Sequence, residues 1–207
     1  MPEVTLIDAV KMAQPDAASV VVFASRGIGP NHGGWLSDFL VKHTPCRRVG
    51  ALAGPGLASE GVDGSPTAMV VASPFEEVCA LTQKALHSEH CRIYTSSDLR
   101  GVELAGAMVK TLAVAVGVAD GVNYGVGAKG VIITRGIAEA SRLGAAIGAH
   151  PKTFWGLAGV GDLVSCAASE KHPSYAAGLA LARGGAISSG IIEETCALLR
   201  LAQSKGV

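Results

Sequence analysis

The longest apolar segment of the chain runs from Thr95 to Gly121, and its hydrophobic residues recur with the 3.6-residue spacing of an α-helix. Ser97 or Asp98 can cap its first amides, and Gly121 ends the pattern. A helix that is apolar on nearly every side belongs in a protein interior. Polar residues interrupt the segment, so we expect the central helix of a soluble domain and no membrane span. These residues are Glu103, Lys110 and Asp120.

Before this helix the pattern alternates between helix and strand. The run Val20–Ala24 is apolar throughout, as buried strands are, and it follows a short amphipathic helix at Val4–Met12. This alternation indicates an α/β domain over residues 1–97 that holds only part of a sheet. The other predicted strands are Val49–Ala53, Thr67–Ala72 and Cys91–Thr95, and the other helices are Gly33–His43 and Pro74–Leu86.

After Gly121 only helical patterns follow, so the sequence predicts a second, all-α domain over residues 98–207. Asp162 stands where it could cap one of these helices, which would begin near Gly159. The remaining predicted helices are Ala128–Ile147, Thr153–Leu157, Ser174–Arg183 and Ile191–Ser204.

Composition narrows the classes of function. The chain carries 17 basic and 17 acidic residues, so no net field steers it to nucleic acid or to an anionic membrane. Its five cysteines form no CxxC pair, which argues against a zinc site or a disulfide framework. The first ten residues, MPEVTLIDAV, do not have the pattern of a signal peptide, and we expect a cytoplasmic location.

The chain holds one glycine-rich loop, Gly27 to Gly34, that resembles a phosphate-binding turn. Its spacing matches neither GxGxxG nor a Walker loop, and Pro30 removes one of the amides that would hold an anion. A plain strand-to-helix turn is the favoured interpretation. The histidines show no metal-binding spacing, and no GxSxG turn marks a nucleophile.

Several longer segments resemble one known family. Four segments are similar, in their order along the chain, to motifs of bacterial NAD-dependent glycerol-3-phosphate dehydrogenase: AGPGLASEGVDGSPTAMVVAS, GVELAGAMVKTLAVAVGVADG, AKGVIITRGIAEASRLGAAIG and GLAGVGDLV. The similarity extends from about Val20 to Val207. It implies a partial Rossmann-like domain over residues 1–97, followed by a helical domain of the 6-phosphogluconate dehydrogenase type over residues 98–207.

The resemblance also implies that the family's opening strand, GxGxxG turn and helix have no counterpart in this sequence, nor do its last helices. That turn holds the cofactor pyrophosphate in a Rossmann domain. We therefore expect no cofactor, and NAD(P) only if the family activity is retained.

At the implied active site, the family's catalytic lysine falls on Val109, which can neither polarise a carbonyl nor exchange a proton. Lys110 follows directly, but one residue of helix turns a side chain by about 100°. We expect Lys110 to be a paired or snorkelling helix lysine. The phosphate-binding Ser-Arg-Asn-Arg run of the family falls on His172 to Tyr175, so its arginines are absent.

Other family positions are retained. The resemblance gives Asp162 and Thr134 as catalytic-site residues, and Arg26, Lys129 and Arg135 as substrate-binding candidates. Lys129 and Arg135 fit a structural role in helix ion pairs equally well, and the sequence leaves that choice open.

Two functions are compatible with these observations. One is a degenerate, non-catalytic relative, in effect a pseudoenzyme, that acts as a binding or interaction module, with a small phosphorylated molecule as one candidate ligand. The other is an NAD(P)-dependent oxidoreductase acting on glycerol 3-phosphate or a similar phosphorylated alcohol. The losses at Val109 and at the phosphate-binding run favour the first.

We also expect a homodimer that buries Val20–Ala24 or the region of the central helix. The run from Val20 to Ala24 contains no charged residue, and an open strand edge of this kind invites pairing. Either Pro2–Ile7 folds back as a strand, or a second copy covers the edge.

The chain is expected to bind NADH with a dissociation constant weaker than about 10 μM, which corresponds to about 7 kcal/mol of binding free energy. The reason is the absence of a recognisable glycine turn for the pyrophosphate. Fluorescence titration of NADH or calorimetry measures this directly, and tighter binding would contradict the expectation.

Overall fold

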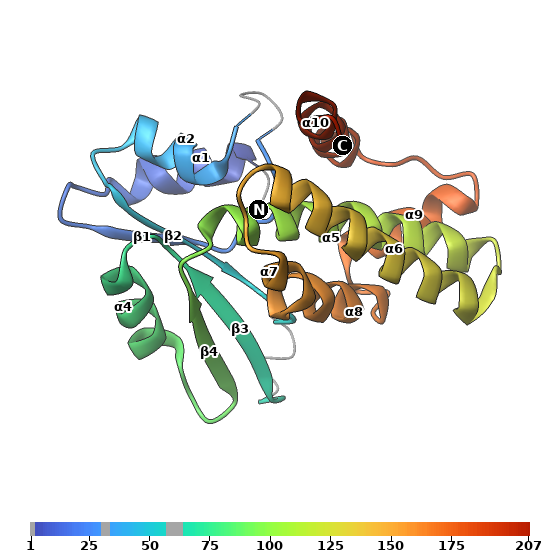
Figure 1. Ribbon diagram of the computed structural model, residues 1–207, viewed down its shortest axis with the longest axis horizontal. Helices are drawn as coiled ribbons and strands as arrows, with labels where there is room; N and C mark the ends of the chain where they lie inside the picture. Colours follow the sequence, from blue (N-terminus) through green and yellow to red (C-terminus); the bar gives the residue numbers. More distant parts are fainter. Residues whose placement is uncertain (1–2, 30–33, 57–63) are drawn as a thin grey trace.

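The computed structural model describes residues 3–29, 34–56 and 64–207. Its four strands form one mixed sheet in the order β1-β2-β3-β4 (Figure 1). β1 and β2 are parallel, β2 and β3 are antiparallel, and β3 and β4 are parallel. The strands are β1 Val20–Phe23, β2 Arg48–Ala53, β3 Thr67–Ala72 and β4 Cys91–Ser96.

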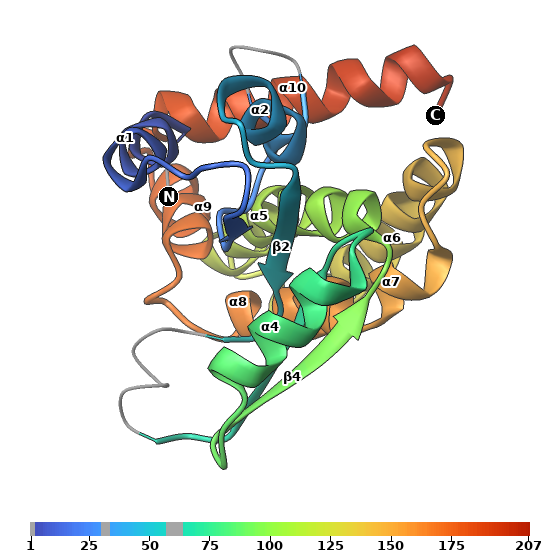
Figure 2. The same ribbon diagram turned by 90° about the vertical axis from the view of Figure 1, so that its left-hand side faces the viewer.

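The alternation of side chains along the strands divides the core between the two faces of the sheet. Phe23 and Val49 belong to the main core, which also contains residues of α1, α2 and α5. Val71 and Ile93 belong to a smaller cluster on the opposite face, which is covered by α4 (Figure 2). These helices are α1 Glu3–Ala13, α2 Leu36–His43, α4 Glu76–Leu86 and α5 Leu99–Gly121.

Helix α5 is the central helix of the fold. It is capped by Asp98, whose Oδ1 accepts a hydrogen bond of 2.9 Å from the amide of Gly101. The remaining helices surround α5 and follow it in the chain (Figures 1 and 2). They are α6 Gly125–Ala146, α7 Pro151–Trp155, the π-helical turn η1 Leu157–Gly161, α8 Asp162–Ala167, α9 Pro173–Ala182 and α10 Ser189–Lys205.

Glycine lets α5 and α9 touch backbone to backbone. A Cβ atom on Gly117 would lie 2.2 Å from the carbonyl oxygen of Tyr175, and one on Gly178 would lie 2.1 Å from that of Val114. No side chain fits in either place, so these two glycines fix how closely the helices pack.

Among the described residues, α5 is the one helix long and apolar enough to cross a membrane by length and composition. However, 61% of its most apolar stretch is buried inside the fold. The core helix of a folded domain has this property as well.

The predicted fold class, α/β followed by all-α, is confirmed, and most predicted elements lie within a few residues of the observed ones. Two expectations were wrong. Residues from Glu3 onward form a helix, so Pro2–Ile7 does not fold back as a strand. Asp162 is the first residue of α8 and does not cap a helix, because its carboxylate is engaged elsewhere. The division at residues 97 and 98 stays a prediction.

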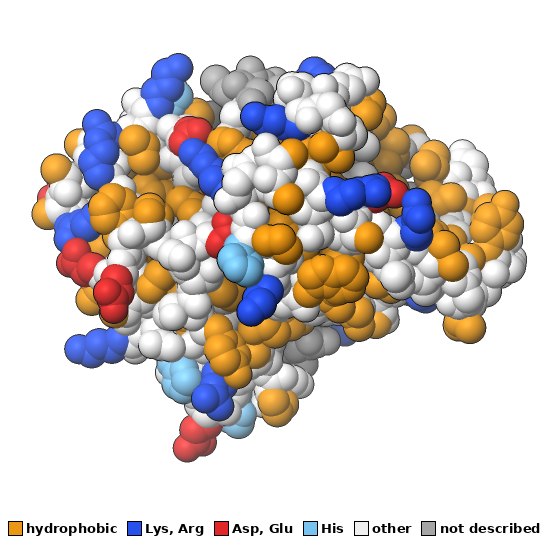
Figure 3. Space-filling model, viewed as in Figure 1, with side chains coloured by type: hydrophobic (Ala, Val, Ile, Leu, Met, Phe, Trp, Pro, Cys, Tyr) orange, Lys and Arg blue, Asp and Glu red, His pale blue; other side chains and the backbone are white. Residues whose placement is uncertain are grey.

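Strand β1 is an edge strand, since it pairs only with β2 in the described part of the chain. A groove of about 310 Å³ runs between β1 and α1 and is lined mainly by apolar residues, among them Leu6, Val10 and Val22. Apolar side chains also gather at the end of the molecule where α5 meets α6 (Figure 3). Both surfaces are available for association.

We propose that two copies associate through β1, and we expect light scattering to give twice 20.9 kDa at micromolar concentration. Val22→Lys places a charge on the edge strand and should produce monomers. Met12→Lys is the matched control, because Met12 is 86% exposed on α1. A wild-type mass of one chain would reject the proposal.

Candidate functional site

A bidentate ion pair joins the sheet to the helical part of the molecule. Arg26 follows β1, and its Nε and Nη2 atoms each donate a hydrogen bond of 2.7 Å to the carboxylate of Asp162 at the start of α8. The same Nη2 also donates to the carbonyl oxygen of Gly54, which follows β2, at 3.2 Å. The arginine side chain passes Gly106 of α5, where a Cβ would lie 3.4 Å from Arg26 Cγ, an ordinary contact distance. The structure thus brings two predicted site residues, Arg26 and Asp162, together.

A second ion pair lies beside the first. Lys110 of α5 donates a hydrogen bond of 3.2 Å to the backbone carbonyl of Arg26, and its ammonium group also pairs with the carboxylate of Glu194 on α10. The hydroxyl groups of Thr111 and Thr195 lie 3.4 Å apart and link the same two helices. Lys110 is therefore the paired helix lysine that the sequence predicted.

Burial changes the acid–base character of Asp162. Its side chain is almost fully buried, and this raises its pKa above the ordinary value although Arg26 opposes the shift. The thiol of Cys166, 3.7 Å from Asp162 Oδ1, is affected in the same direction. Burial and the nearby carboxylate raise the pKa of Cys166 to about 12, so it is a neutral thiol at pH 7.

His172 is the one buried side chain with an unpartnered polar atom in the described part of the chain. It is the N-cap residue of α9 and only 5% exposed, and its Nδ1 has no hydrogen-bond partner. Burial and the positive charges of Arg26 and Lys110 lower its pKa to about 4. The ring is therefore neutral at pH 7.

Val109, on which the family's catalytic lysine falls, is fully buried and belongs to the hydrophobic core. Its position on α5 cannot present a functional group to the space around Arg26 and Asp162 without opening that core.

The structure does not bring the other predicted residues to this site. Thr134 and Arg135 lie on an exposed part of α6, where Arg135 is 3.6 Å from Glu139. Lys129 pairs with Asp120 at 2.6 Å, and its ammonium group lies 5.8 Å from the centre of the Tyr175 ring. No described hydrogen bond or ion pair connects these residues with Arg26 or Asp162. The catalytic role of Thr134 and the substrate contacts of Lys129 and Arg135 stay predictions.

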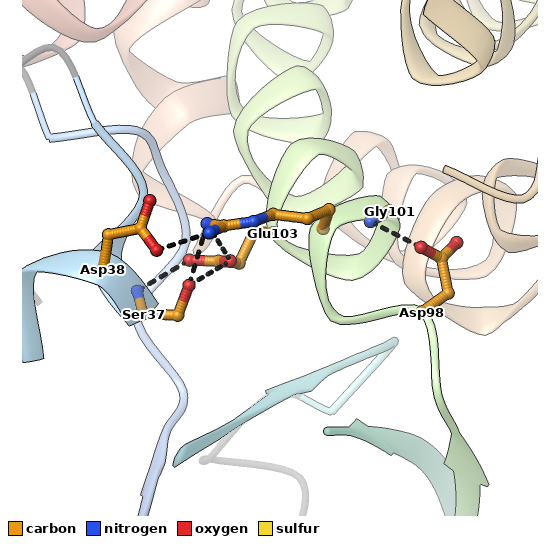
Figure 4. A network of polar contacts seen from close by, with 6 residues as sticks. Ser37, Asp38, Asp98, Gly101 and Glu103 are labelled. Carbon is orange, nitrogen blue, oxygen red and sulfur yellow. Dashed lines mark hydrogen bonds and ion pairs between the residues drawn. The ribbon is translucent and has the colours of Figure 1, made fainter. Parts of the chain in front are cut away.

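At the amino end of α2, a backbone amide is bound by the carboxylate of Glu103 from α5 (Figure 4). The buried carboxylate of Glu103 accepts hydrogen bonds from the amide of Ser37 at 2.9 Å and from its hydroxyl at 2.7 Å. Arg100 lies 3.4 Å from the same carboxylate, and its guanidinium also pairs with Asp38. Residues 30–33 of the glycine-rich loop lie outside the described residues, but in the helix after it the amide of Ser37 is already bound by Glu103.

Sequence reasoning missed Glu194 and the isolated ring of His172. Glu194 stands on an ordinary amphipathic helix, and only the fold brings it to Lys110, 84 residues earlier in the chain. His172 was noted only as a replacement within the phosphate-binding run. Hydrophobic spacing carries no information on contacts between helices far apart in the chain, so no sequence signal could have found these contacts.

Two family models match this fold and sequence: the NAD-dependent glycerol-3-phosphate dehydrogenase C-terminus over residues 98–203, and the N-terminus of the same enzyme over residues 3–79. The class defined by the mixed sheet and the helical bundle is thus that of the glycerol-3-phosphate dehydrogenases. The chain belongs to the NAD-dependent glycerol-3-phosphate dehydrogenase family.

Curated relatives agree with this assignment. The chain is 39% identical over 172 residues to the glycerol-3-phosphate dehydrogenase [NAD(P)+] of Halorhodospira halophila, a match that covers 83% of this chain and 52% of the relative. It is 38% identical over 192 residues to that of Ectopseudomonas mendocina, covering 92% and 56%. The chain therefore spans about half the length of the curated relatives it matches.

Solved structures show the same fold. The glycerol-3-phosphate dehydrogenase of Coxiella burnetii superposes with a TM-score of 0.87 at 28% identity, over 98% of this chain and 65% of that one. The enzyme of Plasmodium falciparum gives a TM-score of 0.80 over 97% of this chain and 60% of that one. At 14% identity, the second match is informative about the fold alone.

The neutral, buried ring of His172 should make the protein sensitive to acid. Unfolding restores the ordinary pKa of 6.5, whereas the folded ring stays neutral down to about pH 4, so stability falls as the pH drops through this window. At pH 5 this linkage amounts to about 2 kcal/mol.

Chemical denaturation at pH 7 and pH 5 should show that His172→Gln loses less stability on acidification than the wild type. The exposed His87→Gln is the control and should follow the wild type. Equal acid sensitivity of His172→Gln and the wild type would contradict the assignment.

Proposed function

We propose that this chain is a non-catalytic relative of the glycerol-3-phosphate dehydrogenases that acts as a binding module. The observation that supports the proposal is that the site where the family resemblance places catalysis lacks an available acid or base. The position of the catalytic lysine is filled by the core residue Val109, and both nearby cations, Arg26 and Lys110, are held by internal carboxylates.

The chemistry of these groups supports the proposal. A general acid must exchange a proton near neutral pH, and an arginine cannot do so because its pKa lies above about 12. Arg26 is in addition fixed by Asp162 and Gly54. Lys110 is bound by Glu194, and the thiol of Cys166 is not ionised at pH 7, so neither is an available base or nucleophile.

The described residues do not fit a nicotinamide dinucleotide. A Rossmann site holds the pyrophosphate with free amides at the start of a helix that follows a strand. Here the first helix after β1 is α2, and its Ser37 amide is bound by the buried carboxylate of Glu103. A second anion in this place would be repelled by the negative charge of Glu103.

One observation favours a second candidate, an oxidoreductase that acts with NAD(P) on a small phosphorylated alcohol. The family residue Asp162 is present and held in a precise geometry by Arg26. Catalytic carboxylates are often positioned in this way. A test of turnover distinguishes the two candidates.

Purified protein is expected to show no steady oxidation of NADH with dihydroxyacetone phosphate. Val109→Lys alone should not restore it, because the new lysine would lie in the core and the cations beside it would remain paired. Absorbance at the NADH wavelength is the measurement. Turnover by the wild type that disappears in Asp162→Ala would refute the proposal in favour of the oxidoreductase.

A further inference from the structure

A second cleft opens where the sheet meets the helices, and neither Arg26 nor Asp162 lines it. Its volume is about 330 Å³, and its walls come from β3, β4, the start of α5, α7 and η1. Val70 of β3 lies in the wall, whereas its neighbour Val71 packs under α4, so the cleft is on the sheet face opposite α4. Small-molecule sites have volumes of about 300–1,000 Å³ and are often found between domains. The cleft therefore has the size and place of such a site.

The floor of this cleft is apolar. Val102 and Ala158 are buried, and Val70 and Leu157 are half-buried beside them. At the edge stands Tyr94 of β4, which is 47% exposed. An exposed aromatic ring next to an apolar floor suits the flat, apolar body of an organic ligand.

The tyrosine ring already contacts one planar cation. The guanidinium carbon of Arg92 lies 5.5 Å from the centre of the Tyr94 ring. Arg92 is not among the residues that line the cleft, so it does not cover the part of the ring that faces the cleft. That part is open to a second planar group.

The rim of the cleft offers hydrogen-bond donors. Lys152 of α7 is exposed and has no ion pair in the part of the chain that the structure describes. The Nδ1 atom of His150 accepts a hydrogen bond of 3.2 Å from the amide of Lys152, so its Nε2 carries the ring hydrogen of the neutral imidazole and can donate. One ammonium group and one ring N–H thus stand two residues apart at the same edge.

The carboxylate in the lining is already occupied. Asp98 is the one acidic residue among the described residues that line the cleft. Its Oδ1 accepts from the amide of Gly101 at 2.9 Å, and its Oδ2 accepts from the amide of His150 at 2.9 Å and from the hydroxyl of Thr153 (Figure 4). The donors of the rim are therefore left for an acceptor from solution, and a carboxylate is the acceptor that matches an ammonium group best.

The same bonds of Asp98 hold the cleft in shape. They connect the first turn of α5 with the start of α7, and the amide of Asp98 donates to the hydroxyl of Ser96 in β4 at 3.1 Å. Both walls are thus fixed before a ligand arrives. A preformed site loses little conformational entropy on binding.

We propose that this cleft binds a small aromatic carboxylate. Its ring lies on the apolar floor against Tyr94, and its carboxylate accepts hydrogen bonds from Lys152 and His150. A bare inorganic anion would leave the floor unused, and an uncharged ring would leave Lys152 without a counter-charge. This site goes beyond the proposed function, since it does not depend on the state of Arg26 and Asp162.

The test is an NMR titration of the full chain with benzoate, with benzamide and cyclohexanecarboxylate in parallel. Benzoate should saturate with a dissociation constant of about 1 mM or tighter and should shift the amide signals of Ser97, Lys152 and Thr153. Benzamide, which lacks the charge, should bind about tenfold more weakly.

Two variants separate the charge from the ring. Lys152→Gln should weaken benzoate about tenfold and leave benzamide unchanged, and Lys152→Arg should restore benzoate binding. The control is Lys84→Gln, which removes an exposed charge from α4. Tyr94→Leu should weaken benzoate about threefold but not cyclohexanecarboxylate, with Tyr124→Leu as control because Tyr124 is 73% exposed elsewhere.

The absence of saturation below about 10 mM benzoate would overturn this inference. So would signal shifts that lie outside β4 and α7, or equal affinities of Lys152→Gln and Lys84→Gln. The shift map of the wild type needs no variant, so the proposal can be rejected even if a variant fails to fold. Turnover of NADH by the wild type would defeat the proposed function and leave this titration unaffected.

Discussion

The bidentate pair between Arg26 and Asp162 is the contact on which the arrangement of the site depends. It connects the end of β1 with the start of α8, and through Gly54 it also reaches the end of β2. Removing one partner from such a pair costs about 3–5 kcal/mol, because the other charge stays buried and unpaired. The pair adds less to stability than this, since burying both charges is itself expensive. Its main effect is therefore to fix the relative position of the sheet and the helices.

Helix α5 packs against both parts of this contact. Arg26 lies beside Gly106 at ordinary van der Waals distance, and Gly117 admits the backbone of α9. Between these two positions lie Val109, in the core, and Lys110, on the side facing Arg26 and Glu194. One residue of helical rotation thus separates a core valine from an ion-paired lysine. Because of this rotation, we expect that a lysine at position 109 would point into the core and could not form the ion pair that Lys110 forms with Glu194.

The sequence predicted the fold better than the site. Hydrophobic periodicity located the central helix and β3 almost to the residue, because each buries a continuous apolar pattern. The family resemblance gave Arg26 and Asp162 as candidates, but the local pattern assigned Asp162 a capping role, because a local pattern cannot show a partner 136 residues away. For the same reason, the sequence did not predict that Lys110 pairs with Glu194 or that His172 Nδ1 is buried without a partner. Such contacts are set by tertiary packing, which no short spacing encodes.

Two internal carboxylates satisfy polar groups of the helices. Glu103 satisfies the amino end of α2, and Glu194 neutralises Lys110. They differ in burial, which decides how each can behave. Glu103 is 4% exposed, accepts two hydrogen bonds from Ser37 and is part of the folded core, so its replacement by a ligand would require local unfolding. The side chains of Lys110 and Glu194 are 24% and 19% exposed, so solvent reaches Glu194 more readily than it reaches Glu103.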